Sequence, residues 1–80
     1  MTISSSQCRA ARALLGWSRK QLAQSALIAE RTLVDFERGA RNPLGRTLLD
    51  IRRALEEAGV IFIDEDELGP GVRLREPAPR

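Results

Sequence analysis

Apolar residues recur at helical spacing near the start of the chain, at Cys8, Ala11, Leu14 and Leu15. These intervals of three and four predict a helix over residues 5–15 with one buried face. Ser4 and Gln7 fit a capping box, in which each side chain binds the backbone N–H of the other residue. Gly16 supplies the C-terminal stop.

The residues that follow carry the signal for the start of a second helix. Ser18 is expected to cap a helix, with Gln21 as its partner in another capping box. Trp17 is expected to pack onto Leu22 across this cap. The helix should stop near Ser25, and its inward residues are predicted to be Leu22, Ala23 and Ala26.

A third helix is predicted over residues 29–38, with Leu33 and Phe36 facing inward. Gly39 is its expected C-terminal stop. The three predicted helices are short, and the connections between them are shorter still.

The fourth predicted helix carries the longest apolar stripe, at Leu44, Leu48, Ile51, Leu55 and Ala58. It is expected to follow a turn at residues 41–43, with Asn42 as the N-cap and Pro43 as the first helical residue. Gly59 ends it.

The period changes after Gly59. Residues 60–63 are β-branched or aromatic and predict a strand. Residues 69–71 predict a turn, and Val72 and Leu74 alternate with arginines in a second strand. Residues 76–80 are expected to form a flexible tail.

These elements predict a mostly α-helical fold: a compact bundle of four or five short helices with a helix-turn-helix, plus a C-terminal β-strand or hairpin. Residues 1–59 are expected to form the helix-turn-helix domain and residues 60–75 an extension. Residues 60–63 are expected either to pack on their own domain or to pair with the same strand of a second copy. Because exposed strand edges find partners, we favour the second alternative, a homodimer.

The composition excludes several chemistries. The 80 residues include no histidine and one cysteine, Cys8. Zinc sites built on paired Cys and His ligands, histidine-dependent triads and an intrachain disulfide therefore cannot form. We expect no enzyme, no metal and no cofactor, and a buried, inert Cys8. Without a signal peptide or a run of ~20 apolar residues, the chain is expected to be cytoplasmic and free of membrane contact.

Charge is divided unevenly along the chain. Residues 1–53 contain ten Arg or Lys against four Asp or Glu, a balance of +6, and residues 54–80 contain three against seven, a balance of −4. A polyanion would be attracted to the first part and repelled by the acidic run at residues 64–67. Arginine, which supplies all but one of the cations, suits phosphate and guanine better than lysine does.

Residues 19–38 have the pattern of a helix-turn-helix within the basic segment. Ala23 faces the crossing helix, where a larger side chain would force the two helices apart. Apolar residues fill the wedge between the helices, at Leu22, Ala26, Ile28, Leu33 and Phe36. Four residues remain on the outer side of the second helix, free to meet a partner: Arg31, Val34, Asp35 and Arg38.

Three stretches carry a family resemblance. They are Trp17-Ser18-Arg19-Lys20-Gln21-Leu22-Ala23-Gln24, Ala29-Glu30-Arg31-Thr32-Leu33-Val34-Asp35-Phe36-Glu37-Arg38-Gly39 and Arg41-Asn42-Pro43. With its Leu-Ala pair, its Glu-Arg-Gly and the Asn-Pro that follows, the sequence resembles the Cro and lambda-repressor-like helix-turn-helix family, often labelled XRE. The resemblance covers roughly residues 6–58. It implies a bundle of mostly short helices whose third helix lies in the DNA major groove.

The resemblance also implies roles for individual residues. Glu30, Arg31 and Asp35 fall on the family's base-reading positions. Arg19 opens the second helix, where the family contacts the DNA backbone or a base edge, and we expect it to read bases. Arg38, Arg41 and Asn42 fall where the family holds phosphate, and Lys20, Val34 and Arg46 are expected to hold phosphate as well. Arg12 and Glu37 match a family pair that ties the first helix to the third. We expect a structural ion pair there, because a partly buried charge left alone is costly.

The sequence departs from the family pattern at two places. Leu27 stands where the turn usually has a glycine in the left-handed conformation. This conformation costs a non-glycine residue about 1–2 kcal/mol, so a reshaped turn is expected. Ala29 replaces the usual Ser or Thr cap of the third helix, the one implied to lie in the major groove. A capping contribution of about 1 kcal/mol to the stability of this helix is therefore missing.

The sequence therefore predicts a sequence-specific DNA-binding regulator, a repressor, that reads the major groove with residues 29–38. Such homodimers bind near-palindromic operators with half-sites about 34 Å apart. The alternative is an antiactivator or antitoxin that binds another regulatory protein through the same fold. Carboxylates at Glu30, Asp35 and Glu37 favour this alternative, because they are unfavourable near phosphates, and fold alone does not decide function.

Overall fold

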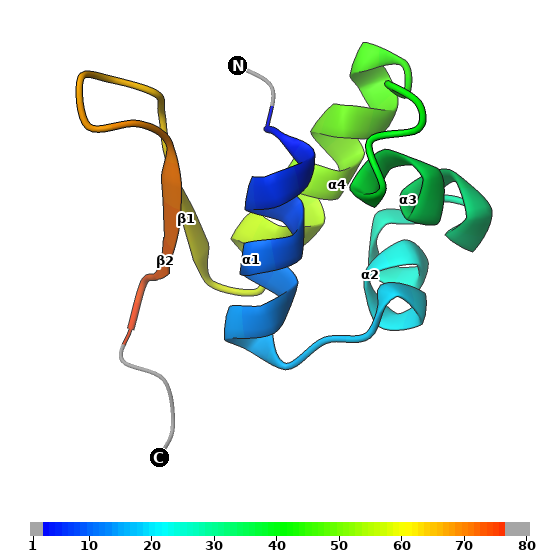
Figure 1. Ribbon diagram of the computed structural model, residues 1–80. Coiled ribbons are helices and arrows are strands. Elements are labelled where there is room, and N and C mark those ends of the chain that lie inside the picture. Colours follow the sequence, from blue (N-terminus) through cyan, green and yellow to red (C-terminus); the bar gives the residue numbers. More distant parts are fainter. Residues whose placement is uncertain (1–2, 77–80) are drawn as a thin grey trace.

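Four helices and a two-stranded hairpin make up residues 3–76, the part of the chain that the computed structural model describes. In chain order they are α1 (Ser5–Leu15), α2 (Arg19–Ala26), α3 (Glu30–Glu37), α4 (Gly45–Glu57), β1 (Val60–Ile63) and β2 (Gly71–Leu74). In Figure 1, α2 and α3 lie at one end of the molecule, the hairpin lies at the other, and α1 and α4 lie between them. The predicted fold class, a small helical bundle with a C-terminal hairpin, is confirmed. Of the predicted tail, residues 77–80 lie outside the described residues.

Both predicted capping boxes are present. The Ser4 hydroxyl accepts a hydrogen bond from the Gln7 backbone N–H at 3.1 Å, and the Gln7 side chain returns the contact. Ser18 and Gln21 form the same pair of bonds at the start of α2. These local bonds fix where the first two helices begin.

The turn between α2 and α3 keeps the backbone geometry that usually requires glycine. Leu27 has φ 58° and ψ 44°, the left-handed conformation, and follows α2, which ends at Ala26, one residue beyond the predicted stop. The expected reshaping of this turn is therefore wrong. The helix pair keeps its geometry, and the strain remains in the backbone of a leucine whose side chain is 91% exposed.

The start of α4 corrects another prediction. The helix begins at Gly45 with Leu44 as its N-cap and without a side-chain cap, so Asn42 is not the cap and Pro43 is not helical. A capping side chain contributes about 1 kcal/mol, less than the packing that decides where α4 must begin. Leu44, predicted on the buried stripe, is 80% exposed because it precedes the helix.

The core collects side chains from every element. The largest fully buried apolar side chains are Cys8, Leu22, Leu33, Ile51 and Leu55, and Phe36 and Val60 are nearly as well buried. Trp17 is half-buried and packs against this cluster. Leu14 was predicted on the buried face of α1, but Leu15 takes the inward position in the last turn and leaves Leu14 at the surface.

The hairpin packs against α1 and α4 with one face. Its antiparallel register pairs Val60 with Leu74 and Phe62 with Val72, and these four residues face inward. Gln7 connects the hairpin to α1, because its side-chain amide donates to the main-chain carbonyls of Ile63 and Gly71 at 3.2 and 3.1 Å. The same residue thus serves a helix cap and holds the hairpin on the side of α1 away from α3.

Candidate nucleic-acid interface

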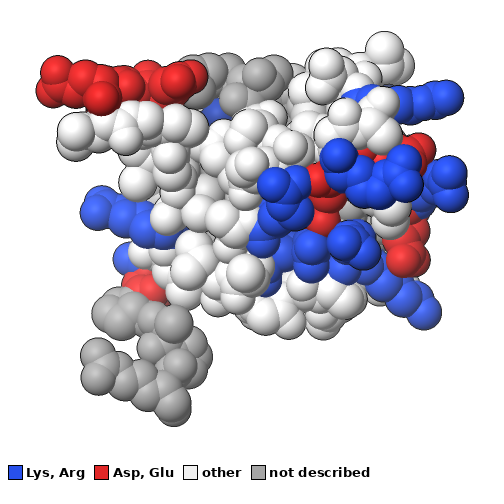
Figure 2. Space-filling model, in the orientation of Figure 1, with Lys and Arg blue, Asp and Glu red and all other residues white. Residues whose placement is uncertain are grey.

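Basic side chains gather at the end of the molecule formed by α2 and α3. Figure 2 shows them spread over that end, whereas the acidic side chains of the hairpin turn, residues 64–67, project from the opposite end. The acidic turn of the hairpin therefore lies apart from the basic side chains of α2 and α3. A polyanion would approach the end that carries α3.

The outward face of α3 carries a small ionic cluster. The Arg31 side chain is 82% exposed, and its Nε lies 3.4 Å from a carboxylate oxygen of Asp35, one turn further along the helix. Arg38 lies 4.0 Å from the other oxygen, and its side chain is 62% exposed. Asp35, by contrast, is only 17% exposed. Two arginines thus project into solvent around one largely covered carboxylate.

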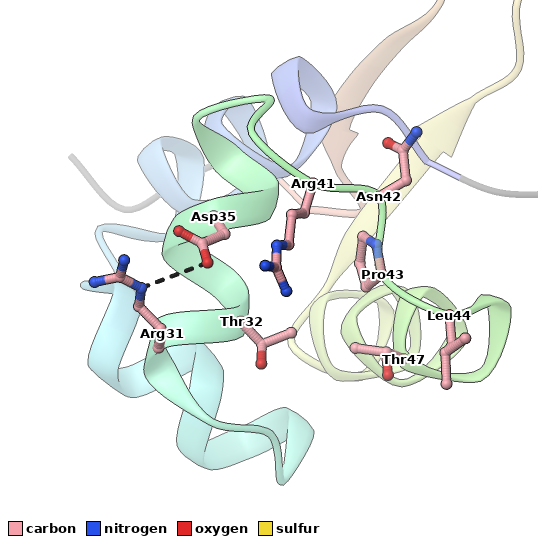
Figure 3. A pocket seen from close by; sticks show the side chains of 8 residues that line it. All are labelled: Arg31, Thr32, Asp35, Arg41, Asn42, Pro43, Leu44 and Thr47. Atoms are coloured by element: carbon pink, nitrogen blue, oxygen red, sulfur yellow. Dashed lines mark ion pairs between the residues drawn. The ribbon is translucent and has the colours of Figure 1, made fainter.

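A groove of about 420 Å³ runs between this face and the start of α4. Figure 3 shows the side chain of Arg41 reaching from the connection between the helices into the groove, whereas that of Asn42 points away from it. The groove is lined by Arg31, Thr32, Asp35, Arg41, Asn42, Pro43, Leu44 and Thr47. Its walls combine the Arg41 side chain with an apolar edge at Leu44, whereas the guanidinium of Arg31 points away from Arg41 (Figure 3).

A buried carboxylate holds the other side of α3. Glu37 is 2% exposed, and its two oxygens lie 2.7 Å from Nε and Nη2 of Arg12. Arg19 Nε lies 3.1 Å from one of these oxygens, and the Cys8 thiol donates to the other at 3.2 Å. Arg9 adds a hydrogen bond to the main-chain carbonyl of Glu37. Side chains from α1 and α2 thus converge on the C-terminal turn of α3.

This network shifts three pKa values. Burial alone would raise the pKa of Glu37, but the hydrogen bonds from Arg12 and Cys8, the charge of Arg12 and the hydrogen bond from Arg19 outweigh it and lower that pKa. The bond to Glu37 raises the pKa of Arg12. Burial, followed by the bond to the ionised Glu37, raises the pKa of the Cys8 thiol far above its ordinary value. Glu37 is therefore charged and Cys8 a neutral donor at neutral pH.

The predicted site residues divide between two environments. Arg31, Asp35, Arg38 and Arg41 lie together beside the groove. Glu30, Lys20 and Arg46 are exposed, and Val34 is half-buried. Arg19, expected to read bases, is about half exposed and pairs with Glu37, so its guanidinium also belongs to the buried network.

Four groove residues were absent from the predicted site: Thr32, Pro43, Leu44 and Thr47. Thr32 lies three residues before Asp35, and Thr47 follows Leu44 by the same interval. This spacing places each pair on one side of the chain, a signal that a helical projection of the sequence contains. The bond between Cys8 and Glu37 has no such signal, because 29 positions separate the two residues.

Within residues 3–76, no group of three or more His, Cys, Asp or Glu side chains is arranged to hold a metal ion. Each helix in this part of the chain is too short or too polar to cross a membrane.

A family model described as helix-turn-helix matches residues 9–58, which is more than half of the chain. The match contains all four helices except the first residues of α1. No curated protein matches the sequence.

Proposed function

Because the chain belongs to the Cro/C1-type (XRE) helix-turn-helix family of DNA-binding regulators, we propose that it is a sequence-specific repressor that inserts α3 into the major groove. The observation that carries this proposal is the outward face of α3. Arg31 is 82% exposed there, and the hairpin packs at the far end of the molecule (Figure 1). A helix presented in this way fits the width of a major groove.

Arg31 is the residue best suited to read a base. Its guanidinium can donate two parallel hydrogen bonds to guanine, the commonest specific contact in the major groove. Asp35 is too covered for a primary contact, and its 3.4 Å separation from Arg31 suits it to orient that side chain. We therefore assign Asp35 a positioning role, with Glu30 at the exposed start of α3 as a further base contact.

Phosphate contacts are proposed for the cations around α3. Arg38 and Arg41 flank the C-terminal end of the helix, and Arg46 lies in the first turn of α4. Lys20 and Arg19 lie in the first turn of α2, where helix-turn-helix proteins cross the DNA backbone. Asn42 is exposed beside them, and Val34 offers its backbone or methyl groups. Phosphate contacts fix register, while base contacts specify sequence.

Repression needs only occupancy of an operator, which this surface supplies without a further activity. We propose a homodimer on a near-palindromic operator, because helix-turn-helix dimers match their two-fold symmetry to that of the DNA. The balance of +6 over residues 1–53 supports the electrostatic part of this binding.

A protein partner remains the second candidate, supported by one observation. Leu44 is 80% exposed at the edge of the groove, beside the arginines, and such a mixed surface suits an acidic helix with apolar residues. The carboxylates of α3 support a protein partner less strongly in the structure than in the sequence alone. Glu37 is buried and Asp35 is paired, so Glu30 alone presents an unpaired carboxylate on the outer face of α3.

One pair of experiments separates the two candidates. Selection from a pool of random duplexes, at about 0.1 M salt, should enrich a near-palindromic sequence that the protein retards at low micromolar concentration. An affinity pull-down from the native cytoplasm is run in parallel. No enrichment by selection, together with stable capture of one regulatory protein, would overturn the repressor and support the partner.

A further inference from the structure

The second strand of the hairpin has an open edge. The Arg75 N–H donates to the Gly59 carbonyl at 2.7 Å, which makes this pair a hydrogen-bonded one. Because bonded and non-bonded pairs alternate in an antiparallel ladder, the N–H and C=O groups of Val72 and Leu74 point away from β1. In the described part of the chain the sheet has two strands, and no third strand takes these groups.

The two strands differ in how well their inward side chains are covered. On β1, Val60 is 3% and Phe62 is 8% exposed. Arg52 of α4 lies over the Phe62 ring, 5.4 Å from its centre. Their partners on β2, Leu74 and Val72, are only half-buried. The core is therefore complete beneath β1 and incomplete beneath β2.

A groove follows the incomplete side. It has a volume of about 190 Å³ and lies between α1, at Ser6 and Ala10, and the edge of the hairpin at Pro70 and Val72. The small side chains of Ser4, Ser6 and Ala10 line it on the α1 side together with Gln7, so an apolar side chain from outside can enter. The shape fits one more strand beside β2.

The hairpin also carries separated opposite charges. Arg73 on β2 and Arg75 directly after it are exposed, and neither has an ion pair within residues 3–76. Residues 64–67, all acidic and exposed, form the turn at the other end of the same hairpin. A strand that ran antiparallel to β2 would place its own arginines beside this acidic turn.

We propose that a second copy of the chain docks on this edge, with β2 antiparallel to β2 about a two-fold axis at Val72. In this register Val72 faces Val72, Arg73 faces Gly71, and Leu74 faces Pro70. The second copy's Leu74 then lies at the groove beside Pro70, and its two arginines lie along the acidic turn. An axis at Arg73 would oppose like charges, which is destabilising.

The pairing joins two marginal hairpins into one four-stranded sheet, and sheets of three or more strands are stable where a lone hairpin is not. It also differs from the pairing expected from the sequence, which used residues 60–63. The hairpin lies opposite α3, so α3 remains uncovered in both copies (Figure 1). The inference deepens the proposed function by identifying the surface that makes the regulator two-fold symmetric.

Sedimentation equilibrium without DNA tests the charge complementarity. The chain should sediment at twice its mass of 8.9 kDa at micromolar concentration. Arg73→Glu should raise the dimer dissociation constant by about tenfold or more, because the new carboxylate meets the acidic turn. Adding Asp64→Arg should restore most of the affinity. Arg53→Glu, the same charge change on an exposed position of α4, is the matched control and should have no effect.

Cysteine cross-linking tests the register. Bonded antiparallel pairs have Cα atoms about 5.5 Å apart, within reach of a disulfide. Val72→Cys should therefore form a covalent dimer under mild oxidation, while Arg73→Cys should not. Cys8 does not interfere, because it is fully buried. Cross-linking at position 73 instead of 72 would overturn the proposed axis.

Two further results would overturn the dimer itself: a mass of 8.9 kDa at every concentration up to about 1 mM, or a dimer unaffected by Arg73→Glu. Failure of the dimer and failure of the proposed function remain distinguishable. A monomer that still retards a selected duplex contradicts only the dimer. A dimer that ignores all duplexes contradicts only the DNA-binding proposal.

Discussion

Two carboxylates on α3, two residues apart, have opposite environments. Glu37 is 2% exposed and receives hydrogen bonds from Arg12, Arg19 and Cys8. Asp35 lies on the outer face, where Arg31 and Arg38 approach it at 3.4 and 4.0 Å and extend into solvent. The inner face of α3 is thus held by buried ion pairs and hydrogen bonds. Its outer face carries charged side chains that remain accessible to a partner.

An ion pair stabilises a fold where its charges are buried. A buried carboxylate has lost its water, so removing its partners or its charge leaves a large uncompensated cost. Exposed pairs are screened by water and contribute about 0–1 kcal/mol. We therefore expect the Glu37 network to hold α3 in place, and the Asp35 cluster to orient side chains for recognition.

Glu37→Gln should have the largest effect on stability. The substitution leaves Arg12 partly buried without a counter-charge, and we expect the free energy of unfolding to fall by about 3–5 kcal/mol. Urea denaturation followed by circular dichroism measures this change. A loss below about 1 kcal/mol, the range of an exposed pair, would show that the buried network does not hold α3.

The pH dependence sharpens the same contrast. The folded-state pKa of Glu37 is lowered, so its contribution is fully present above the unfolded-state pKa of about 4.3 and is lost as pH falls through the lower folded value. The stability difference between the native protein and Glu37→Gln should therefore shrink below about pH 4. Denaturation between pH 3 and 7 checks this, and a difference that grows in acid would contradict the assignment.

Leu27→Gly changes the backbone that leads into α3 and leaves both carboxylates in place. Relief of the left-handed strain, reduced by the entropy that glycine adds to the unfolded chain, should stabilise the fold by about 0.5–1 kcal/mol. Ser25→Gly, inside α2, is the matched control and should cost about 1 kcal/mol. Thermal unfolding of both variants gives the comparison. Destabilisation by Leu27→Gly would mean that the exposed leucine makes a stabilising contact.

Asp35→Asn should have the smallest effect on folding, within about 1 kcal/mol of the native protein. Its expected effect is on recognition, because Arg31 loses the carboxylate that orients it. Affinity for a selected duplex should fall by less than in Arg31→Ala. Unchanged binding, measured by fluorescence anisotropy, would remove Asp35 from the positioning role.

Most of the fold was predictable because its signals are local. The capping boxes at Ser4 and Ser18 and the change of period after Gly59 each depend on neighbouring residues, and the structure has all three features. The start of α4 was not, because Asn42 and Pro43 form a plausible cap that tertiary packing overrides. Apolar periodicity identifies the buried face of a helix but not the residue at which the helix begins.

The candidate site was predictable only in part for the same reason. Helical spacing and the family pattern identified Arg31 and Arg38, whose positions depend on one helix. The tie from Gln7 to the hairpin and the pairing of Arg19 with Glu37 join residues 64 and 18 positions apart, respectively. No spacing rule relates such pairs, so they emerge only when the chain has folded.

Whether α3 reads DNA is tested by the ratio of two affinities, one for a selected duplex and one for a scrambled duplex. The ratio is measured at fixed salt for the native protein, Arg31→Ala and Arg41→Ala. Arg31→Ala should lose about 1–3 kcal/mol on the selected duplex alone, so the ratio falls. Arg41→Ala, a proposed phosphate contact, should weaken both duplexes alike and leave the ratio unchanged. A ratio that Arg31→Ala does not alter would contradict the claim that the outward face of α3 reads DNA.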